Sequence, residues 1–248
     1  MTSATSDKQL ILHIGTHKTG SSSFQRSLML NERALAKRGV GVIRERDMDA
    51  ASSNPNEMNL TSLSHLFVRP ELPTPMRLKN ESRPHEGAIK RAVLRRLWAR
   101  DLAKRPQPVL IGSAESFCFL RTAREARQLS GFLSAIHRDL VVLLVARNEA
   151  EWRASWQAQL EKRPKVREGL AKVDPSVRID GDWYFDLAAI RAFWSALGEV
   201  REIDYDAEIA ISGNIVSRLY REAGIDPEGL ETSVRINERP DSGKRGRR

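Results

Sequence analysis

The sequence has one cysteine and no long apolar run. Cys118 is the only cysteine among 248 residues, so no disulfide can form within the chain. It lies in the apolar run 117–120, where we expect a small buried side chain rather than a redox site. No stretch approaches the roughly 18 to 20 apolar residues of a membrane-spanning helix. Residues 1–9 are polar and lack the apolar core of a signal peptide, so we expect no membrane span and a cytoplasmic location.

The chain is basic, with a formal net charge of +9 and a pI near 10.0. Five Lys and Arg residues against Asp241 place +4 of that charge in residues 239–248 and leave +5 on the rest. The remainder favours a polyanionic ligand without implying a specific nucleic-acid partner. With 40% hydrophobic residues, the chain can bury one sizeable core. We predict a flexible N-terminus over 1–9, a single domain over 10–238 and a basic tail over 239–248.

Short apolar runs alternate with segments of helical spacing. The predicted strands are residues 10–14, 40–43, 109–112, 140–145 and 200–205, and the predicted helices are residues 22–37, 122–137, 149–163, 185–197 and 208–223. This order predicts an α/β fold with a central parallel sheet flanked by helices on both faces. Residues 44–85, which are rich in Pro, Asn and Ser, predict an irregular insertion, and residues 164–183 predict a second long loop.

Residues 15–23 connect the first predicted strand to the first predicted helix. Backbone N–H groups at such a helix start can hold an anion. Lys18 adds a positive charge, Gly20 permits close approach of the backbone, and Ser21 and Ser22 supply hydroxyl groups. A nucleotide triphosphatase loop would read G-x-x-x-x-G-K-[ST], and that order is not met here. The sequence therefore predicts an anion-binding loop of another kind.

The run H-K-T-G-S-S resembles the 5′-phosphosulfate-binding loop of sulfotransferases that use 3′-phosphoadenosine 5′-phosphosulfate (PAPS), particularly bacterial members with I-G-x-H-K-T-G-T-T. Serine replaces threonine at two positions and keeps both hydroxyl groups. Such enzymes also bind the 3′-phosphate through an Arg at the end of a buried strand and a Ser eight residues later. Arg147 and Ser155 have that spacing, and a strand end and a helix face two turns on can reach one phosphate. Glu149 stands where many members have Pro.

The resemblance implies a P-loop-containing sulfotransferase fold, PAPS as the sulfuryl donor and 3′,5′-adenosine bisphosphate as the product. The residues that it implies for binding PAPS are His17, Lys18, Thr19, Gly20, Ser21, Ser22, Arg147 and Ser155. The acceptor, a hydroxyl or an amine on a carbohydrate or small molecule, stays unidentified, and so does the oligomeric state.

Sulfuryl transfer requires charge neutralisation at the leaving phosphate oxygen and a base for the acceptor proton. Lys18 fits the first role. Glu115 follows the predicted strand 109–112 and is our candidate for the base, a role that Glu has in several members of the family. His17 is the competing base because an ordinary histidine titrates near neutrality. His65, His85 and His137 have no carboxylate or cysteine at metal-ligand spacing, so we predict no metal site.

Two other functions remain as alternatives. A kinase-like phosphoryl transferase would use the same loop with Mg²⁺ and ATP, but it would need a Lys-Ser/Thr pair and an acidic metal ligand. A non-catalytic polyanion- or nucleotide-binding protein would act through the tail 244–248, which is short and simple in composition.

Overall fold

The computed structural model describes residues 8–45, 58–79 and 87–234, which contain a sheet of five parallel strands. In chain order the strands are β1 (Gln9–Gly15), β2 (Val40–Val42), β3 (Val109–Ser113), β4 (Asp139–Ala146) and β5 (Glu199–Asp204). Their order in the sheet is β2-β3-β1-β4-β5. The predicted parallel α/β sheet is therefore confirmed. Residues 1–7 and 239–248 lie outside the described residues, and Gln9, which we placed in the N-terminal segment, belongs to β1.

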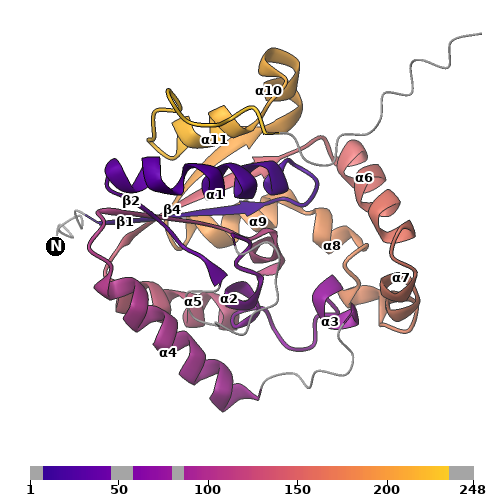
Figure 1. The fold of residues 1–248 in the computed structure, drawn as a ribbon. Coiled ribbons are helices and arrows are strands. Elements are labelled where there is room, and N and C mark those ends of the chain that lie inside the picture. The colour runs from indigo at the N-terminus through magenta and orange to yellow at the C-terminus, as the bar shows by residue number, and fades with distance from the viewer. Residues whose placement is uncertain (1–7, 46–57, 80–86, 235–248) are drawn as a thin grey trace, which may run out of the picture.

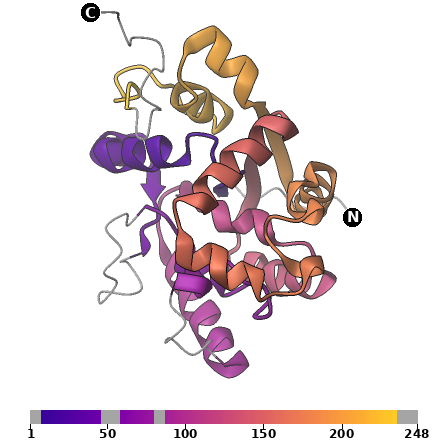
Figure 2. The same ribbon diagram turned by 90° about the vertical axis from the view of Figure 1, so that its right-hand side faces the viewer.

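Helices cover both faces of this sheet (Figures 1 and 2). Because successive strand residues point to opposite faces, Ile11 packs with Phe24 and Leu28 of α1, whereas Leu10 and Leu12 belong to the second core cluster. The helices on the first face are α1 (Ser21–Lys37), α10 (Tyr205–Ser212) and α11 (Val216–Glu222). Those that supply the second face and its edge are α2 (Thr61–His65), α4 (Ala88–Lys104), α5 (Ala123–Ile136), α6 (Glu149–Glu161), α7 (Pro164–Ala171), α8 (Asp182–Phe185) and α9 (Leu187–Ser195).

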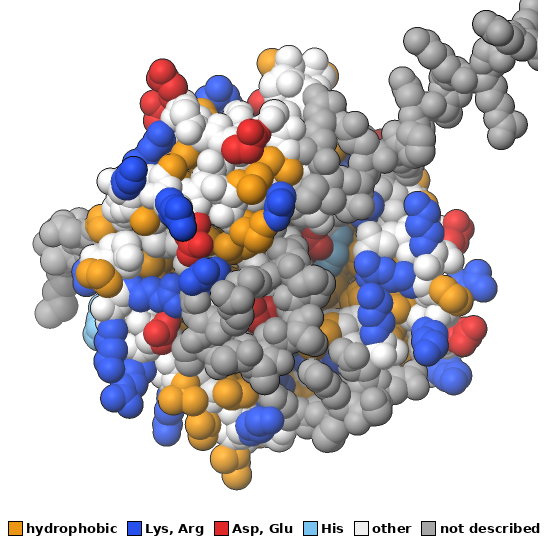
Figure 3. All heavy atoms as spheres, in the orientation of Figure 1, with side chains coloured by type: hydrophobic (Ala, Val, Ile, Leu, Met, Phe, Trp, Pro, Cys, Tyr) orange, Lys and Arg blue, Asp and Glu red, His pale blue; other side chains and the backbone are white. Residues whose placement is uncertain are grey.

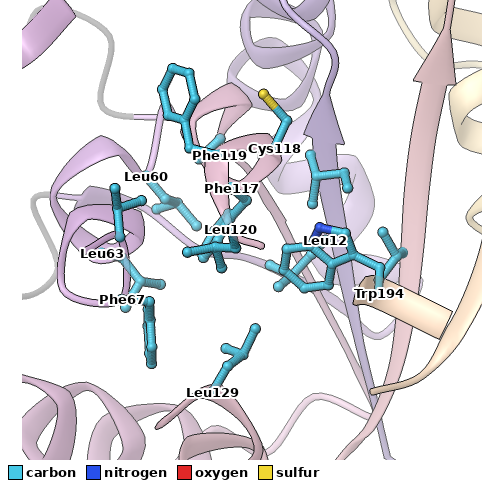
Figure 4. Packing of buried hydrophobic residues seen from close by; sticks show 14 of the residues in the cluster. Leu12, Leu60, Leu63, Phe67, Phe117, Cys118, Phe119, Leu120, Leu129 and Trp194 are labelled. Atoms are coloured by element: carbon cyan, nitrogen blue, oxygen red, sulfur yellow. The ribbon is translucent and has the colours of Figure 1, made fainter. Parts of the chain in front are cut away.

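The predicted irregular insertion is wrong for its second half. Among the residues described there, 58–79, the chain forms α2 and α3 (Pro75–Lys79), and Leu60, Leu63 and Phe67 are buried. Figure 4 shows these three side chains packed with Phe117 and other residues of the 3₁₀ helix η2 (Glu115–Phe119). The composition of this segment predicted irregular structure, but its apolar residues are buried and fix short helices in it.

The predicted loop over 164–183 is also wrong, because it is largely helical. It contains α7, the 3₁₀ helix η3 (Pro175–Val177) and the start of α8. Pro164 occupies the first turn of α7, where a helix does not need its N–H group, and Val166 and Leu170 bury one side of the helix. Two further predictions about helices differ from the structure. Helix α4 was not predicted, and the predicted helix 208–223 is divided at Gly213 into α10 and α11.

The sheet order places the candidate site residues together at the carboxyl ends of the strands. In the sheet, β2 and β3 lie on one side of β1, and β4 and β5 lie on the other. The carboxyl end of β1 is thus a topological switch point, where α/β proteins bind ligands. The loop after β1, Glu115 after β3 and Arg147 after β4 all lie at this edge. No helix in the described part of the chain is long and apolar enough to cross a membrane.

Candidate functional site

The loop between β1 and α1 is held to the neighbouring strand. The backbone N–H of Thr16 donates to the carbonyl oxygen of Val145 at 2.8 Å, and the Thr16 hydroxyl donates to the same oxygen at 3.2 Å. The hydroxyl of Thr19 donates to the Thr16 carbonyl at 2.6 Å, so this side chain braces the loop. Lys18 has φ of 69°, which is uncommon for a residue with a side chain. The loop is therefore fixed in a tight, strained turn against β4.

Helix α1 begins directly after this turn. Gly20 precedes its first residue with φ of 83° and provides no side-chain cap for the first N–H groups. Ser21 is buried, and its hydroxyl faces the Glu115 carboxylate, whose pKa it lowers. An oxyanion of a ligand could also accept a hydrogen bond from this hydroxyl. The helix start, Ser21 and the half-buried Ser22 and Lys18 together fit a phosphate or sulfate group.

Glu115 is the first residue of η2 and lies against this loop. A Cβ atom at Gly15, where φ is 86°, would stand 3.5 Å from the Glu115 Cα, which shows how closely the two backbones approach. The Glu115 side chain is 24% exposed. Burial raises its pKa above the ordinary value, while Ser21, Lys18 and Arg163 lower it by smaller amounts. Glu115 is thus a partly accessible carboxylate with increased basicity.

His17 is enclosed by protein groups. Its Nε2 lies 3.8 Å from Glu115 Oε2, and its Nδ1 lies 2.7 Å from the Tyr184 hydroxyl oxygen. The ring centre is 4.8 Å from that of Trp156 and 5.2 Å from that of Phe119. Burial, followed by the charges of Arg163 and Lys18, lowers the pKa of His17 to about 3. His17 is therefore neutral near pH 7 and is a weaker base than Glu115.

Arg147 and Ser155 lie on the β4–α6 unit, as predicted. Arg147 follows β4 directly, two residues after the carbonyl that anchors the loop. Its Nε lies 3.3 Å from Asp206 Oδ1, and its guanidinium carbon lies 5.2 Å from the centre of the Tyr205 ring. Ser155 is buried two turns into α6. An incoming phosphate would therefore have to share Arg147 with Asp206.

Glu149, which stands where many members of the resembled family have Pro, forms an ion pair with Arg153. Glu149 starts α6 and accepts a hydrogen bond from Arg153 at 2.8 Å. Trp152 and Trp156 lie four residues apart on α6 and are each 1% exposed, so both are core residues.

Two residues near the site were not found from the sequence. Tyr184 comes from α8, and Arg163 comes from the junction of α6 and α7, within electrostatic reach of His17 and Glu115. Neither residue belongs to a local motif. The aromatic run W-Y-F at 183–185 is the sequence signal that could have indicated an aromatic cluster. Figure 3 shows the surface hollowed beside a histidine and an acidic side chain, with Lys and Arg on the adjacent rim.

The buried histidines His13 and His65 form hydrogen bonds with other side chains of the protein. His13 is fully buried, and its Nδ1 lies 2.8 Å from Ser113 Oγ. His65 Nε2 lies 2.8 Å from Thr74 Oγ1. Within residues 8–45, 58–79 and 87–234, no group of three or more His, Cys, Asp or Glu side chains could hold a metal ion. His85 lies outside these residues.

Comparisons with known proteins identify the fold. No protein-family model and no curated protein matches the sequence. Among solved structures, the chain is similar to a sulfotransferase from Alicyclobacillus acidocaldarius, with a TM-score of 0.52 and 15% sequence identity. The match covers 93% of this chain and 87% of that chain. At this identity the likeness concerns the fold alone, so the predicted sulfotransferase-like fold class is confirmed.

Proposed function

We propose that this protein is a sulfotransferase that moves the sulfuryl group of PAPS to an acceptor hydroxyl or amine. The observation that carries the proposal is the start of α1, which has no side-chain cap and where the buried Ser21 hydroxyl lies beside Glu115. The loop would hold the 5′-phosphosulfate through Lys18, Ser21, Ser22 and its backbone N–H groups. The sulfotransferase-like fold supports this assignment because the loop occupies its switch point.

The 3′-phosphate would bind at the neighbouring strand end. Arg147 follows β4, and its guanidinium can donate two hydrogen bonds to a phosphate. Ser155 would supply a hydroxyl from α6. Binding at this place would exchange part of the Arg147–Asp206 contact for a contact with the phosphate. PAPS and 3′,5′-adenosine bisphosphate carry this phosphate, whereas ATP does not.

The transfer step requires one bond to form and one to break. The acceptor oxygen or nitrogen attacks sulfur, the bond between sulfur and the bridging phosphate oxygen breaks, and the phosphate leaves with that electron pair. Glu115 would take the proton of the acceptor, and Lys18 would stabilise the negative charge on the leaving oxygen. The raised pKa of Glu115 suits it to this role, because a stronger base accepts the proton more readily.

The kinase-like alternative has less support. The residue after Lys18 is Thr19, but Gly20 then separates this pair from the start of α1, unlike a nucleotide triphosphatase loop. The described residues also contain no cluster of acidic side chains for a metal. The tail invoked for a polyanion-binding function lies outside the described residues.

Calorimetric titration tests the proposal directly. We expect 3′,5′-adenosine bisphosphate to bind more tightly than ATP with Mg²⁺, and adenosine 5′-monophosphate to bind weakly. At 100 times its dissociation constant, the bisphosphate should stabilise the fold by about 2.7 kcal/mol, which a thermal melt detects. Equal affinity for the bisphosphate and for ATP would refute the assignment of the donor. Tight binding of a short oligonucleotide alone would favour the polyanion-binding alternative.

A further inference from the structure

Both ring nitrogens of His17 have a polar neighbour, and the two neighbourhoods differ. The Tyr184 hydroxyl oxygen is 2.7 Å from Nδ1, and the Cys118 sulfur is 3.4 Å from the same nitrogen. On the other side, Glu115 Oε2 is 3.8 Å from Nε2. His17 is 7% exposed and Tyr184 is fully buried. Two potential donors thus face Nδ1, and an acceptor faces Nε2.

The direction of the Tyr184 hydrogen bond follows from its surroundings. Burial raises the pKa of Tyr184 far above its usual value and that of Cys118 to about 12, so both groups keep their hydrogens. On the other side of the ring, the ionised Glu115 carboxylate can only accept, so this arrangement favours the proton on Nε2. The Tyr184 hydroxyl then donates its hydrogen to Nδ1. Nδ1 then accepts, and the single proton of the neutral imidazole lies on Nε2.

We propose that Tyr184 is a positioning residue that fixes His17 in the tautomer with the proton on Nε2, so that an N–H group is directed at Glu115. Glu115 is the group that would contact the acceptor, and His17 acts on it by stabilising and orienting its carboxylate. The distance of 3.8 Å is longer than a hydrogen bond, and catalytic contacts of this kind commonly shorten when substrates bind. The consequence for rate rests on the proposed function, whereas the tautomer does not.

Other charged groups around the pair are consistent with this arrangement. Glu115 is faced by Lys18 and Arg163, and by the Ser21 hydroxyl. His17 is also within reach of these two cations and of His65, and each of them disfavours a positive charge on its ring. The imidazole therefore stays neutral, and a neutral imidazole has one N–H group to direct. The Tyr184 hydroxyl at Nδ1 and the Glu115 carboxylate at Nε2 together favour the proton on Nε2.

Nuclear magnetic resonance tests the tautomer without any substrate. A two-bond ¹H–¹⁵N correlation spectrum of the full chain distinguishes the two neutral tautomers, and a His17→Asn variant assigns the signals. We expect wild-type His17 to have Nε2 protonated and to remain neutral at pH 5. In Tyr184→Phe, Nδ1 protonation should become detectable. Nδ1 protonation in the wild type, or an unchanged spectrum in Tyr184→Phe, would overturn the proposal.

Tyr220→Phe is the matched control for this experiment. Tyr220 is also fully buried, and its hydroxyl lies 3.1 Å from Ser27 Oγ on α1, in the core cluster on the opposite face of the sheet from Tyr184. The variant loses one buried hydroxyl, as Tyr184→Phe does, but the His17 signals should not change. A change of equal size in both variants would show a general effect of lost packing and would overturn the specific role of Tyr184. The wild-type spectrum decides the tautomer even if one variant does not fold.

The pH dependence of transfer tests the action on Glu115. Loss of the oriented N–H group removes a stabilising contact from the carboxylate, so its pKa should rise. The acid limb of the kcat/KM profile should therefore move to higher pH by about half a unit in Tyr184→Phe, the effect of a weak hydrogen bond. Tyr220→Phe should leave it in place. An unmoved limb in Tyr184→Phe would refute the action on Glu115. Absence of transfer by the wild type would instead refute the proposed function and leave the tautomer result standing.

Discussion

Replacing Arg147 by methionine should selectively remove the contribution of the 3′-phosphate to nucleotide binding. Methionine keeps much of the apolar length of the side chain and removes its charge. A hydrogen bond to a charged group contributes about 1.5 to 3 kcal/mol, which corresponds to roughly 10- to 100-fold in affinity. Arg147 already contacts Asp206 and Glu151 at 3.3 and 3.5 Å, so phosphate binding exchanges contacts rather than adding them. We therefore expect the lower end, about 10-fold.

The assay compares two nucleotides in each protein. Calorimetry with 3′,5′-adenosine bisphosphate and with adenosine 5′-monophosphate measures what the 3′-phosphate contributes to binding. In Arg147→Met the ratio of the two affinities should fall by about 10-fold, while affinity for the monophosphate should change little. Thermal stability should fall by less than about 1 kcal/mol, because the partner carboxylates of Asp206 and Glu151 are 38% and 64% exposed.

Arg153, on the helix α6 that follows Arg147, supplies a matched control. Its guanidinium contacts Glu149 at 2.8 Å and Asp182 at 2.9 Å and lies 4.2 Å from the centre of the Phe185 ring. It thus has two carboxylates and one aromatic neighbour, as Arg147 has, but it does not follow the end of β4. Arg153→Met should preserve the preference for the bisphosphate. An equal loss of affinity for both nucleotides in Arg147→Met, or the same selectivity loss in Arg153→Met, would refute the proposed 3′-phosphate site.

Two further variants test the loop and the base. Lys18→Ala should lower the transfer rate by about 10²- to 10³-fold with the fold intact, as measured by steady-state kinetics and circular dichroism. Because Lys18 has φ of 69°, Lys18→Gly should be at least as stable as Lys18→Ala, and a lower melting temperature for the glycine variant would contradict the strained turn. Glu115→Gln should retain affinity for the bisphosphate and lose about 10²- to 10⁴-fold in rate. The wild-type rate should fall as the pH drops through a pKa above the ordinary value of a glutamate, and near wild-type turnover by Glu115→Gln would exclude it as the base.

The parts of the site that were predicted from the sequence depend on short separations along the chain. The loop around Lys18 lies between one strand and the next helix, and Arg147 and Ser155 lie on a second such unit. Strand runs and helix starts identify these units because each is determined by local patterns. The fold class followed from the same alternation.

The parts that were missed depend on contacts between distant segments. Tyr184 reaches His17 across 167 positions of sequence, and no local spacing predicts this hydrogen bond. Helix α4 was missed for a different reason: Trp98 and Leu102 face the core, but Ile89 and Leu97 are exposed. A helix with apolar residues on both sides lacks the one-sided pattern that identifies a surface helix.

One environment shifts the pKa values of Glu115 and His17, the two candidates for the base, in opposite directions. Burial disfavours charge on each group, so it raises the pKa of the carboxylate and lowers that of the imidazole to about 3. The nearby cations Lys18 and Arg163 moderate the first shift and strengthen the second. Glu115 thereby remains able to ionise while gaining basicity, and His17 loses the ability to act as a base near neutral pH. The cations that would attract a phosphosulfate group thus also shift the pKa of the proposed proton acceptor and that of the residue proposed to position it to different extents.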